Sequence, residues 1–276
     1  MTIPIPDLFP DELLISMFAR LNDRLRARPS RLGDLLFGSP ASCLDWTIPN
    51  GLARLERLLP PSFQPTVDEM IEAHTLYRFY RVLLPHTTGT LWQEMQKGGD
   101  PAFDASLSNY RNLTGVPVWL RYCPVCAKED KRHFGEFYWH RTHQTPGVFV
   151  CHAHYVFLNE SNVPAYAIPS RSCLNMSAHT ALQTHKPRAL NTSLSSHATL
   201  LSIADTLVKL ARKQTASQVI TSMRPHHLRS LPYEAWNILD PPKPSKTLIP
   251  REQDTTTVIR QIPTAFAGQA WTKNLV

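Results

Sequence analysis

Four residues of the sequence have the types and the spacing of a metal site. Cys123 and Cys126 are separated by two residues, and Cys151 and His154 repeat this spacing further along the chain. Thiolate and imidazole groups are preferred zinc ligands, and four of them close a tetrahedron around a structural ion. The sequence therefore predicts one structural Zn²⁺ bound by these four residues. The histidines that remain alternatives to His154 are His152, His133, His140 and His143.

Two other uses of a Cys-x-x-Cys pair fit the sequence less well. A redox pair needs a helix N-terminus in a βαβ setting, and nothing of that kind surrounds Tyr122. A catalytic zinc needs an open coordination position with an acid or base nearby. Glu136 lies between the two pairs, but it belongs to no His-x-Glu or His-Glu-x-x-His spacing. We therefore expect no enzymatic activity from this site.

The segment between the two pairs is too apolar for a free surface loop. Metal binding supplies much of the folding free energy of a small metal unit, which cannot build a large core by itself. We therefore expect this segment to pack over the metal and against a neighbouring helical domain, within a metal-binding domain at residues 116–160. Its apolar residues are Phe134, Phe137, Tyr138, Trp139, Val148, Phe149 and Val150.

Residues 1–115 are predicted to form a domain of short helices. Apolar residues recur there at helical spacing, and Pro interrupts the chain more often than Gly. Ser30 and Asn50 are expected caps, and Thr66 with Glu69 has the pattern of a capping box. Such helices fit a helix-turn-helix bundle, and they fit a plain helical core equally well. The helices are expected at residues 11–27, 30–37, 50–60, 67–84 and 90–97.

Polar side chains within these helices are assigned ordinary roles. The charges of the first helix, Arg20 among them, are expected mostly outside its apolar stripe. His74 is expected to be a hydrogen-bonded packing residue. Arg78 and Arg81 are expected on a solvated helix edge.

The net charge of +7 is unevenly placed. Residues 1–159 are balanced, so the whole excess of basic side chains lies in residues 160–276. A basic region indicates contact with an anion, here nucleic acid. We expect an irregular linker at 161–196, a basic helical region at 197–240 and a Pro-rich, extended tail at 241–276. The residues predicted to contact nucleic acid or a partner are Lys209, Arg212, Lys213, Arg224 and Arg229.

The cysteine count and the first residues indicate a reducing compartment. The five cysteines are an odd number, and the chain does not begin with a secretory signal, which argues against a disulfide framework. No apolar run approaches the roughly 18–20 residues that cross a bilayer. We expect a cytoplasmic, DNA-associated protein without a membrane segment.

Three stretches, at residues 10–21, 71–85 and 121–154, carry a recognisable pattern. It begins with Pro-x-Glu-Leu and Ser-x-x-x-Arg, continues with Arg-Tyr-Cys-Pro-x-Cys and Gly-Glu-x-Tyr-Trp-x-Arg, and ends with Cys-x-x-His. The residues concerned are Pro10, Glu12, Leu13, Ser16, Arg20, Arg121, Tyr122, Cys123, Pro124, Cys126, Gly135, Glu136, Tyr138, Trp139, Arg141, Cys151 and His154. With this pattern the chain resembles the TniQ/TnsD family of transposon target-selection proteins over most of its first 160 residues.

The resemblance implies a mainly α fold: an N-terminal helix-turn-helix domain followed by zinc-binding knuckles, in a protein that is not an enzyme. Such proteins mark an insertion site and recruit the AAA+ ATPase TnsC, which brings the transposase. Long TnsD-type members read a DNA attachment site themselves. Short TniQ-type members of CRISPR-associated transposons dock on an RNA-guided Cascade complex or on another Cas effector.

Two departures from the family pattern favour the short adaptor type of a CRISPR-associated transposon. Only Cys173 follows the metal site, so a second zinc is not expected, and with 276 residues we expect no further large DNA-reading region. The implied partners are TnsC, Cascade or another CRISPR effector with its guide RNA, and target DNA, with a homodimer left open. A TnsD-type sequence-specific DNA reader is the alternative. The surface expected to face TnsC contains Phe9, Asp11 and Glu12.

Overall fold

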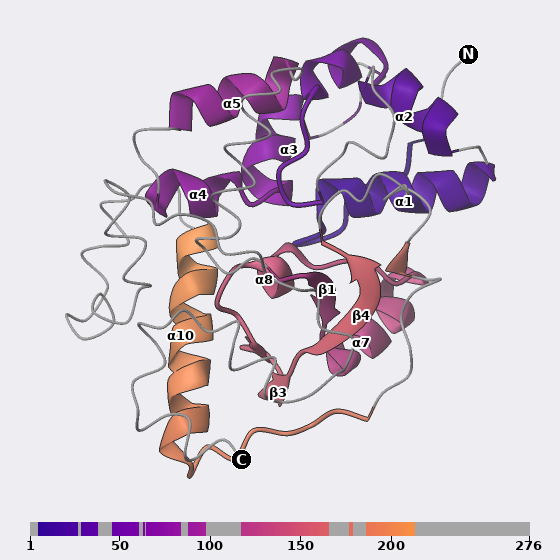
Figure 1. Cartoon of the computed structure of the whole chain (residues 1–276). Coiled ribbons are helices and arrows are strands. Elements are labelled where there is room, and N and C mark those ends of the chain that lie inside the picture. Colours follow the sequence, from indigo (N-terminus) through magenta and orange to yellow (C-terminus); the bar gives the residue numbers. More distant parts are fainter. Residues whose placement is uncertain are drawn as a thin grey trace, which may run out of the picture.

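The computed structural model confirms the mainly α class and places a small metal-binding region beside the helices (Figure 1). Helices α1 to α5 form one layer, and the short strands with α7 and α8 lie beneath it in this view. The predictions for residues 213–276 lie outside the described part of the chain. The structure describes residues 5–26, 29–37, 46–60, 63, 65–83, 88–97, 117–165, 177–178 and 186–212.

Helix α1 (Leu14–Leu25) begins three residues later than the sequence pattern predicts. Asp11 has a φ of 59°, and Glu12 forms an antiparallel β-bridge with His140, so neither residue has helical geometry. The apolar side of α1 is fully buried from Leu14 to Leu21, whereas Leu25 is 41% exposed, and Arg26 ends the helix in the left-handed region. Helix α2 (Pro29–Phe37) follows.

The third predicted helix is a 3₁₀ helix, η2 (Leu52–Arg57), and it is shorter than expected. Gly51 rather than Asn50 precedes its first residue, with a φ of 72°. A Cβ at Gly51 would lie 2.9 Å from the carbonyl oxygen of Phe37, so a larger residue would also clash with the backbone there. The expected Asn50 cap is therefore wrong.

The fourth predicted helix is two helices, α3 (Val67–His74) and α4 (Tyr77–Leu83). The capping box of Thr66 and Glu69 is confirmed at the start of α3. The break occurs at Thr75, whose hydroxyl donates to the carbonyl of Ile71 and accepts from the amide of Tyr77. This side chain competes with the backbone for the hydrogen bonds of a continuous helix. Helix α5 (Thr88–Lys97) completes the layer.

The metal-binding region combines two short β-ladders with two helices. Strand β1 (Trp119–Tyr122) pairs antiparallel with β4 (Asn159–Pro164), and β2 (Val150–Cys151) pairs with β3 (Val156–Phe157). Helices α7 (Pro124–Phe134) and α8 (Arg141–Gln144) lie between them in the chain. Because β4 continues to Pro164, ordered structure extends past the boundary predicted at residue 160.

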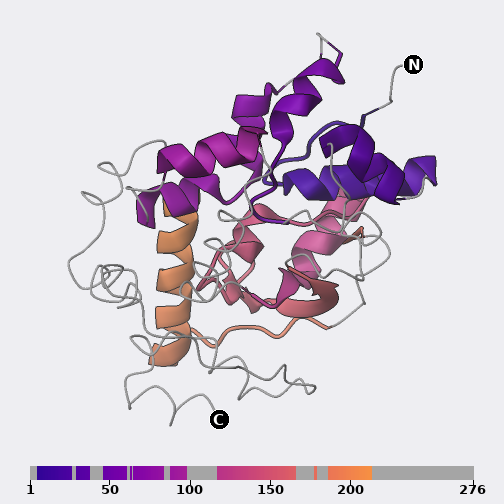
Figure 2. The same ribbon diagram turned by 45° about the horizontal axis from the view of Figure 1, so that its top comes forward.

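Helix α10 (Ser195–Arg212) confirms the helix expected at the start of the basic region. It runs along the edge of the molecule, from the level of β3 up to α4, in both views (Figures 1 and 2). Arg78 of α4 donates to the carbonyl of Arg212 at 2.9 Å, which joins the end of α10 to the helical layer. No helix in the described ranges is long and apolar enough to span a membrane.

Candidate metal centre

The structure brings together the four residues predicted from their spacing. Cys123 is the cap of α7, and its sulfur accepts from the amide of Cys126 at 3.5 Å. Pro124 occupies the first turn of this helix, where a missing amide hydrogen costs nothing. Cys151 ends β2, and His154 lies in the tight turn to β3. The four ligand atoms all lie within 4.8 Å of one another, and the three cysteines are buried and free of disulfides.

The distances fit a tetrahedral ion. Cys126 Sγ and Cys151 Sγ are 3.7 Å apart. A tetrahedral zinc with Zn–S bonds of about 2.3 Å would place two sulfurs about 3.8 Å apart. His154 Nδ1 lies 3.2, 3.5 and 3.6 Å from the sulfurs of Cys126, Cys151 and Cys123. Three thiols and one imidazole fill all four positions of such a site, which is the closed arrangement of structural metal centres.

Contacts around the cluster separate His154 from the other histidines. His154 Nε2 contacts Glu129 Oε2 at 3.0 Å, so its Nδ1 faces the sulfurs while a carboxylate orients the ring. The neighbouring His152 is not part of the cluster. His143 is buried with its Nε2 3.8 Å from Cys126 Sγ, so it borders the cluster without joining it. His140 contacts Asp130 instead, and His133 contacts Arg132 at the exposed end of α7.

The three thiols affect one another's ionisation. Hydrogen bonds from Cys123 and Cys126 lower the pKa of Cys151. The pKa of Cys126 is raised by its hydrogen bonds to Cys123 and Cys151, and burial raises it further. The metal-free cluster therefore keeps protons that a bound cation would displace. Binding of a metal ion is expected to release protons and to weaken as the pH falls.

A second set of polar residues, which we call the clasp, joins α1 to the metal-binding region. Arg20 is its centre: the guanidinium is 4% exposed and bonds Glu12 in a bidentate fashion, at 2.9 and 2.8 Å. The same group donates to Glu136 at 2.7 Å, and Arg24 donates to the other oxygen of Glu136 at 2.6 Å. The clasp consists of Asp11, Glu12, Ser16, Arg20, Glu136, Trp139, Arg141 and Thr142.

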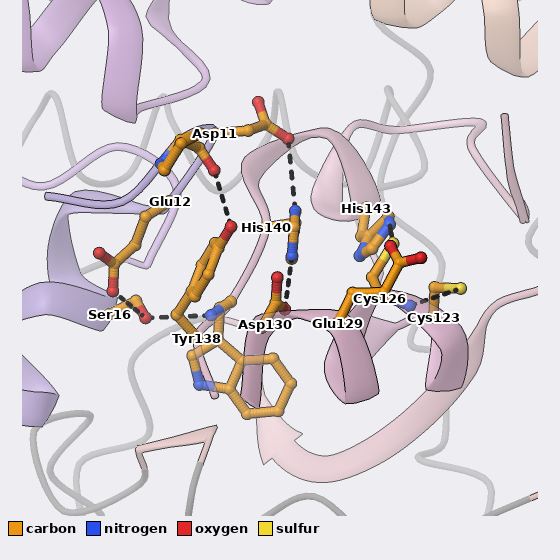
Figure 3. A network of polar contacts seen from close by, with 12 residues as sticks. Asp11, Glu12, Ser16, Cys123, Cys126, Glu129, Asp130, Tyr138, His140 and His143 are labelled. Carbon is orange, nitrogen blue, oxygen red and sulfur yellow. Dashed lines mark hydrogen bonds and ion pairs between the residues drawn. The ribbon is translucent and has the colours of Figure 1, made fainter. Parts of the chain in front are cut away.

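Backbone contacts continue the clasp along the segment after Glu136. The amide of Leu13 donates to the carbonyl of Trp139 at 2.8 Å. The Ser16 hydroxyl accepts from the amide of Trp139 at 3.0 Å (Figure 3). Asp11 accepts from Arg141 and from the amide of Thr142. The Trp139 ring is fully buried and packs edge-on against Trp46. The expected packing of this aromatic segment against the helical domain is confirmed.

Charges in the clasp are held by specific partners. Burial by itself would raise the pKa of Glu136, but hydrogen bonds from Arg20 and Arg24 outweigh it and lower the pKa. Glu136 is therefore ionised at neutral pH and neutralises the arginines. The expectation that Arg20 lies outside the buried side of α1 is wrong, because two carboxylates compensate its charge inside the interface.

His140 connects the clasp to α7. Its Nε2 lies 2.8 Å from Asp130, its Nδ1 lies 4.0 Å from Asp11, and its ring stacks on Tyr138 (Figure 3). Burial lowers the pKa of His140, but the hydrogen bond and the charge of Asp130, helped by Asp11, outweigh this and raise it. A positive His140 between two carboxylates therefore stabilises the junction. As predicted, His74 is a packing residue, and its Nδ1 donates to the carbonyl of Glu12 at 2.8 Å.

The remaining predicted site residues have different environments. Glu12 is fully buried, Asp11 is bound within the clasp, and Phe9 stacks on Phe134 and on the guanidinium of Arg20. These three residues have internal contacts, and the proposed contact with TnsC remains a prediction. Lys209 and Arg212 lie on α10, where Lys209 pairs with Asp205. The other three, Lys213, Arg224 and Arg229, lie outside the described residues.

A helical layer joined to a Cys₃His cluster that could hold a metal ion defines a mainly α protein with a zinc-finger-like site. Within that class the chain belongs to the TniQ family, whose model matches residues 4–158 and so more than half of the chain. Family membership supports a general role in selecting transposition targets. No curated protein matches the sequence.

Most clasp residues belong to the family pattern, but the pattern does not indicate that they contact one another; Asp11 and Glu12 were expected to face TnsC. The structure shows that five of them hold the metal-binding region on α1 and on the segment that precedes it: Glu12, Ser16, Arg20, Glu136 and Arg141. Thr142 was not predicted, because it lies in a helix of four residues, α8, which is too short to show a periodic pattern in the sequence.

Proposed function

We propose that the protein is a target-selection adaptor that links a DNA-bound targeting complex to the AAA+ ATPase TnsC, and so recruits the transposase. The targeting complex is proposed to be an RNA-guided effector such as Cascade. The observation that carries the proposal is the match to the TniQ family over residues 4–158. An adaptor of this kind works by protein and nucleic-acid contacts and needs no covalent chemistry.

The closed geometry of the metal centre supports a structural role. All four positions around the ion are supplied by protein ligands, and the fourth ligand is oriented by Glu129. A catalytic metal keeps one position open for water or substrate. We propose Zn²⁺ as the ion, because soft thiolates and one imidazole in a tetrahedron are its usual ligands. The bound ion would fold the segment that α1 recognises.

The clasp supports a single rigid unit that presents two surfaces at a fixed distance. Buried ion pairs and backbone bonds connect α1 to residues 136–142, so the helical layer cannot rotate freely against the metal-binding region. An adaptor gains from such rigidity because less conformational freedom is lost when it binds two partners.

Co-elution tests the proposal. The zinc-loaded full chain is mixed with TnsC in one experiment and with the guide-RNA effector complex in another, and each mixture is separated by size. We expect the chain to co-elute with both, and to bridge them when all three are present. Cys151→Ser is expected to lose both partners, whereas Cys43→Ser, a cysteine outside the metal cluster, is expected to retain them. Failure of the wild-type chain to co-elute with TnsC would refute the adaptor role.

The net charge of +7 favours one second candidate, a TnsD-type reader of duplex DNA. Such a protein would bind its own attachment site at least about a thousandfold more tightly than random DNA. The adaptor is expected to bind duplexes weakly and with a strong dependence on salt. A gel shift with target and scrambled duplexes separates the two functions.

A further inference from the structure

The turn that carries His154 ends at Tyr155, whose backbone conformation is sterically unfavourable for a tyrosine. Tyr155 has a φ of 54°, and its amide donates to the carbonyl of Cys151 at 2.9 Å to close the turn. Glycine adopts this left-handed conformation at no steric cost, whereas an aromatic residue does not. The Tyr155 ring is not buried in return, since the residue is 51% exposed. Neither the turn nor the core explains the choice of tyrosine.

A segment from beyond β4 supports Tyr155 from one side. The amide of Leu190 donates to the carbonyl of Tyr155 at 2.8 Å, and the amide of Phe157 donates to the carbonyl of Arg188 at 2.9 Å. The central carbon of the Arg188 guanidinium lies over the Phe157 ring, 4.1 Å from its centroid, while Arg188 stays exposed. Lys186, two residues earlier, is also exposed. Two exposed cations thus lie on the segment that pairs with residues 155–157.

Helix α7 contacts the same turn and also carries exposed cations. Of its acidic residues, Asp130 is buried against His140, and Glu129, which is 46% exposed, pairs with His154. Lys128 and Arg132, one turn apart on the same helix face, are exposed. Among the described residues no carboxylate forms an ion pair with any of the four cations. The knuckle surface, as we call it, consists of Lys128, Arg132, Tyr155, Lys186 and Arg188.

We propose that the knuckle surface binds a single-stranded segment of nucleic acid, with a base stacked on Tyr155 and phosphates contacting the four cations. An exposed aromatic ring between cations is the arrangement that binds single strands without reading their sequence. In a duplex the bases are already stacked on one another, so the ring would gain no contact there. The inference rests on the proposed function in one respect: an adaptor at an RNA-guided complex meets unpaired RNA or displaced DNA.

Fluorescence anisotropy tests the proposal on the zinc-loaded full chain. The probes are labelled oligo-dT and oligo-U of about 12 nucleotides, and a duplex of the same length. We expect both single strands to bind more tightly than the duplex. A difference between the two oligonucleotides identifies the DNA or the RNA strand as the natural source. Duplex binding that equals or exceeds single-strand binding would overturn the proposal, as would no binding at all.

Tyr155→Gly separates a binding role from a structural one. Glycine suits the left-handed turn, so this variant is expected to melt at the same or a higher temperature and to bind one zinc. Loss of the stacking ring is expected to weaken single-strand binding by about five- to tenfold or more. Tyr155→Phe keeps the ring and is expected to bind within about twofold of wild type. Wild-type affinity in Tyr155→Gly would refute the stacking role.

Charge reversal tests the cations. Lys186→Glu with Arg188→Glu is expected to weaken binding and to flatten its salt dependence between about 50 and 200 mM. Arg57→Glu with Lys97→Glu is the matched control, because both residues are exposed cations outside the knuckle surface, on η2 and α5, and the change in net charge is the same. An equal loss in the control would show that only net charge matters and would overturn the proposed site. Tyr155→Gly should still co-elute with TnsC, so failure of this inference is distinguishable from failure of the adaptor role.

Discussion

The metal cluster and the clasp fix the same region of the chain in two different ways. The cluster joins residues at most 31 positions apart, through four side chains around one point. The clasp joins Arg20 to Glu136, 116 positions apart, through several ion pairs and backbone bonds. The cluster gives the region its own fold, and the clasp then orients it on α1. The fold of the metal-binding region and its orientation on α1 therefore depend on different interactions, and a mutation can disrupt one of them without the other.

Cys151→Ser is expected to have the largest effect. Structural zinc contributes about 10–16 kcal/mol in small metal domains, which equals or exceeds the net stability of most proteins. We expect loss of the ion and unfolding of the metal-binding region, measured by elemental analysis and circular dichroism. Cys173→Ser is the control and should retain one equivalent of zinc. Native packing in Cys151→Ser without metal would show that the clasp alone can hold the region.

Arg20→Met breaks the clasp and leaves the cluster intact. The substitution leaves the fully buried carboxylate of Glu12 without its arginine partner. We therefore expect a loss of about 3–5 kcal/mol in the free energy of unfolding. Arg24→Met is the matched control: Arg24 bonds the same Glu136 but is 48% exposed, so it should cost less than about 1 kcal/mol. Zinc content should stay at one in both variants. Similar costs for the two arginines in urea denaturation would contradict a buried clasp.

Thr66→Ala removes a polar network at the surface, and its cost in stability can be compared with that of the buried clasp. Thr66 and Glu69 bond each other reciprocally at the start of α3, in full contact with solvent. Removing the cap should cost about 1 kcal/mol, well below the cost of Arg20→Met. Thr66→Ser should retain most of the stability. A cap worth as much as Arg20 would mean that burial does not distinguish the two networks.

The pH dependence of stability gives the smallest expected effect. The pKa of His140 is raised above its ordinary value of 6.5, so the folded state holds this proton more tightly than the unfolded chain. The contribution of protonated His140 to the free energy of unfolding is complete below about pH 6.5, and it is lost as the pH rises through the folded-state pKa. In zinc-loaded protein His140→Gln should reduce the fall in unfolding free energy above neutral pH. An unchanged pH profile would exclude a charged His140 from the junction.

The metal ligands could be predicted from the sequence, whereas the clasp could not. Thiols two residues apart are rare and chemically specific, so Cys123 and Cys126 indicate their role by spacing alone. Glutamate and arginine are common on helix surfaces, and nothing in the pattern of α1 places Arg20 in an interface rather than in water. The partner that decides this, Glu136, is remote in sequence.

Secondary structure was predictable wherever one local signal dominated. The capping box fixed the start of α3, and the apolar period located α1 and α10. Tertiary contacts decided the exceptions: Glu12 bridges His140 before α1 can begin, and Thr75 divides a helix that its neighbours favour. The pairing of β4 with β1 escaped prediction because its residues, rich in Asn and Ser, lack the usual strand composition.

The separation of 116 positions between Arg20 and Glu136 has a consequence for synthesis on the ribosome. Glu12 and helix α1 emerge first, and Glu12 and Arg20 lie on the side that is later buried. It must wait for more than a hundred further residues before the partner of that side exists. During this interval the apolar side of α1 is open to other contacts, and contacts between such distant residues form slowly. Early fragments of the chain are therefore the species most exposed to aggregation and to chaperone capture.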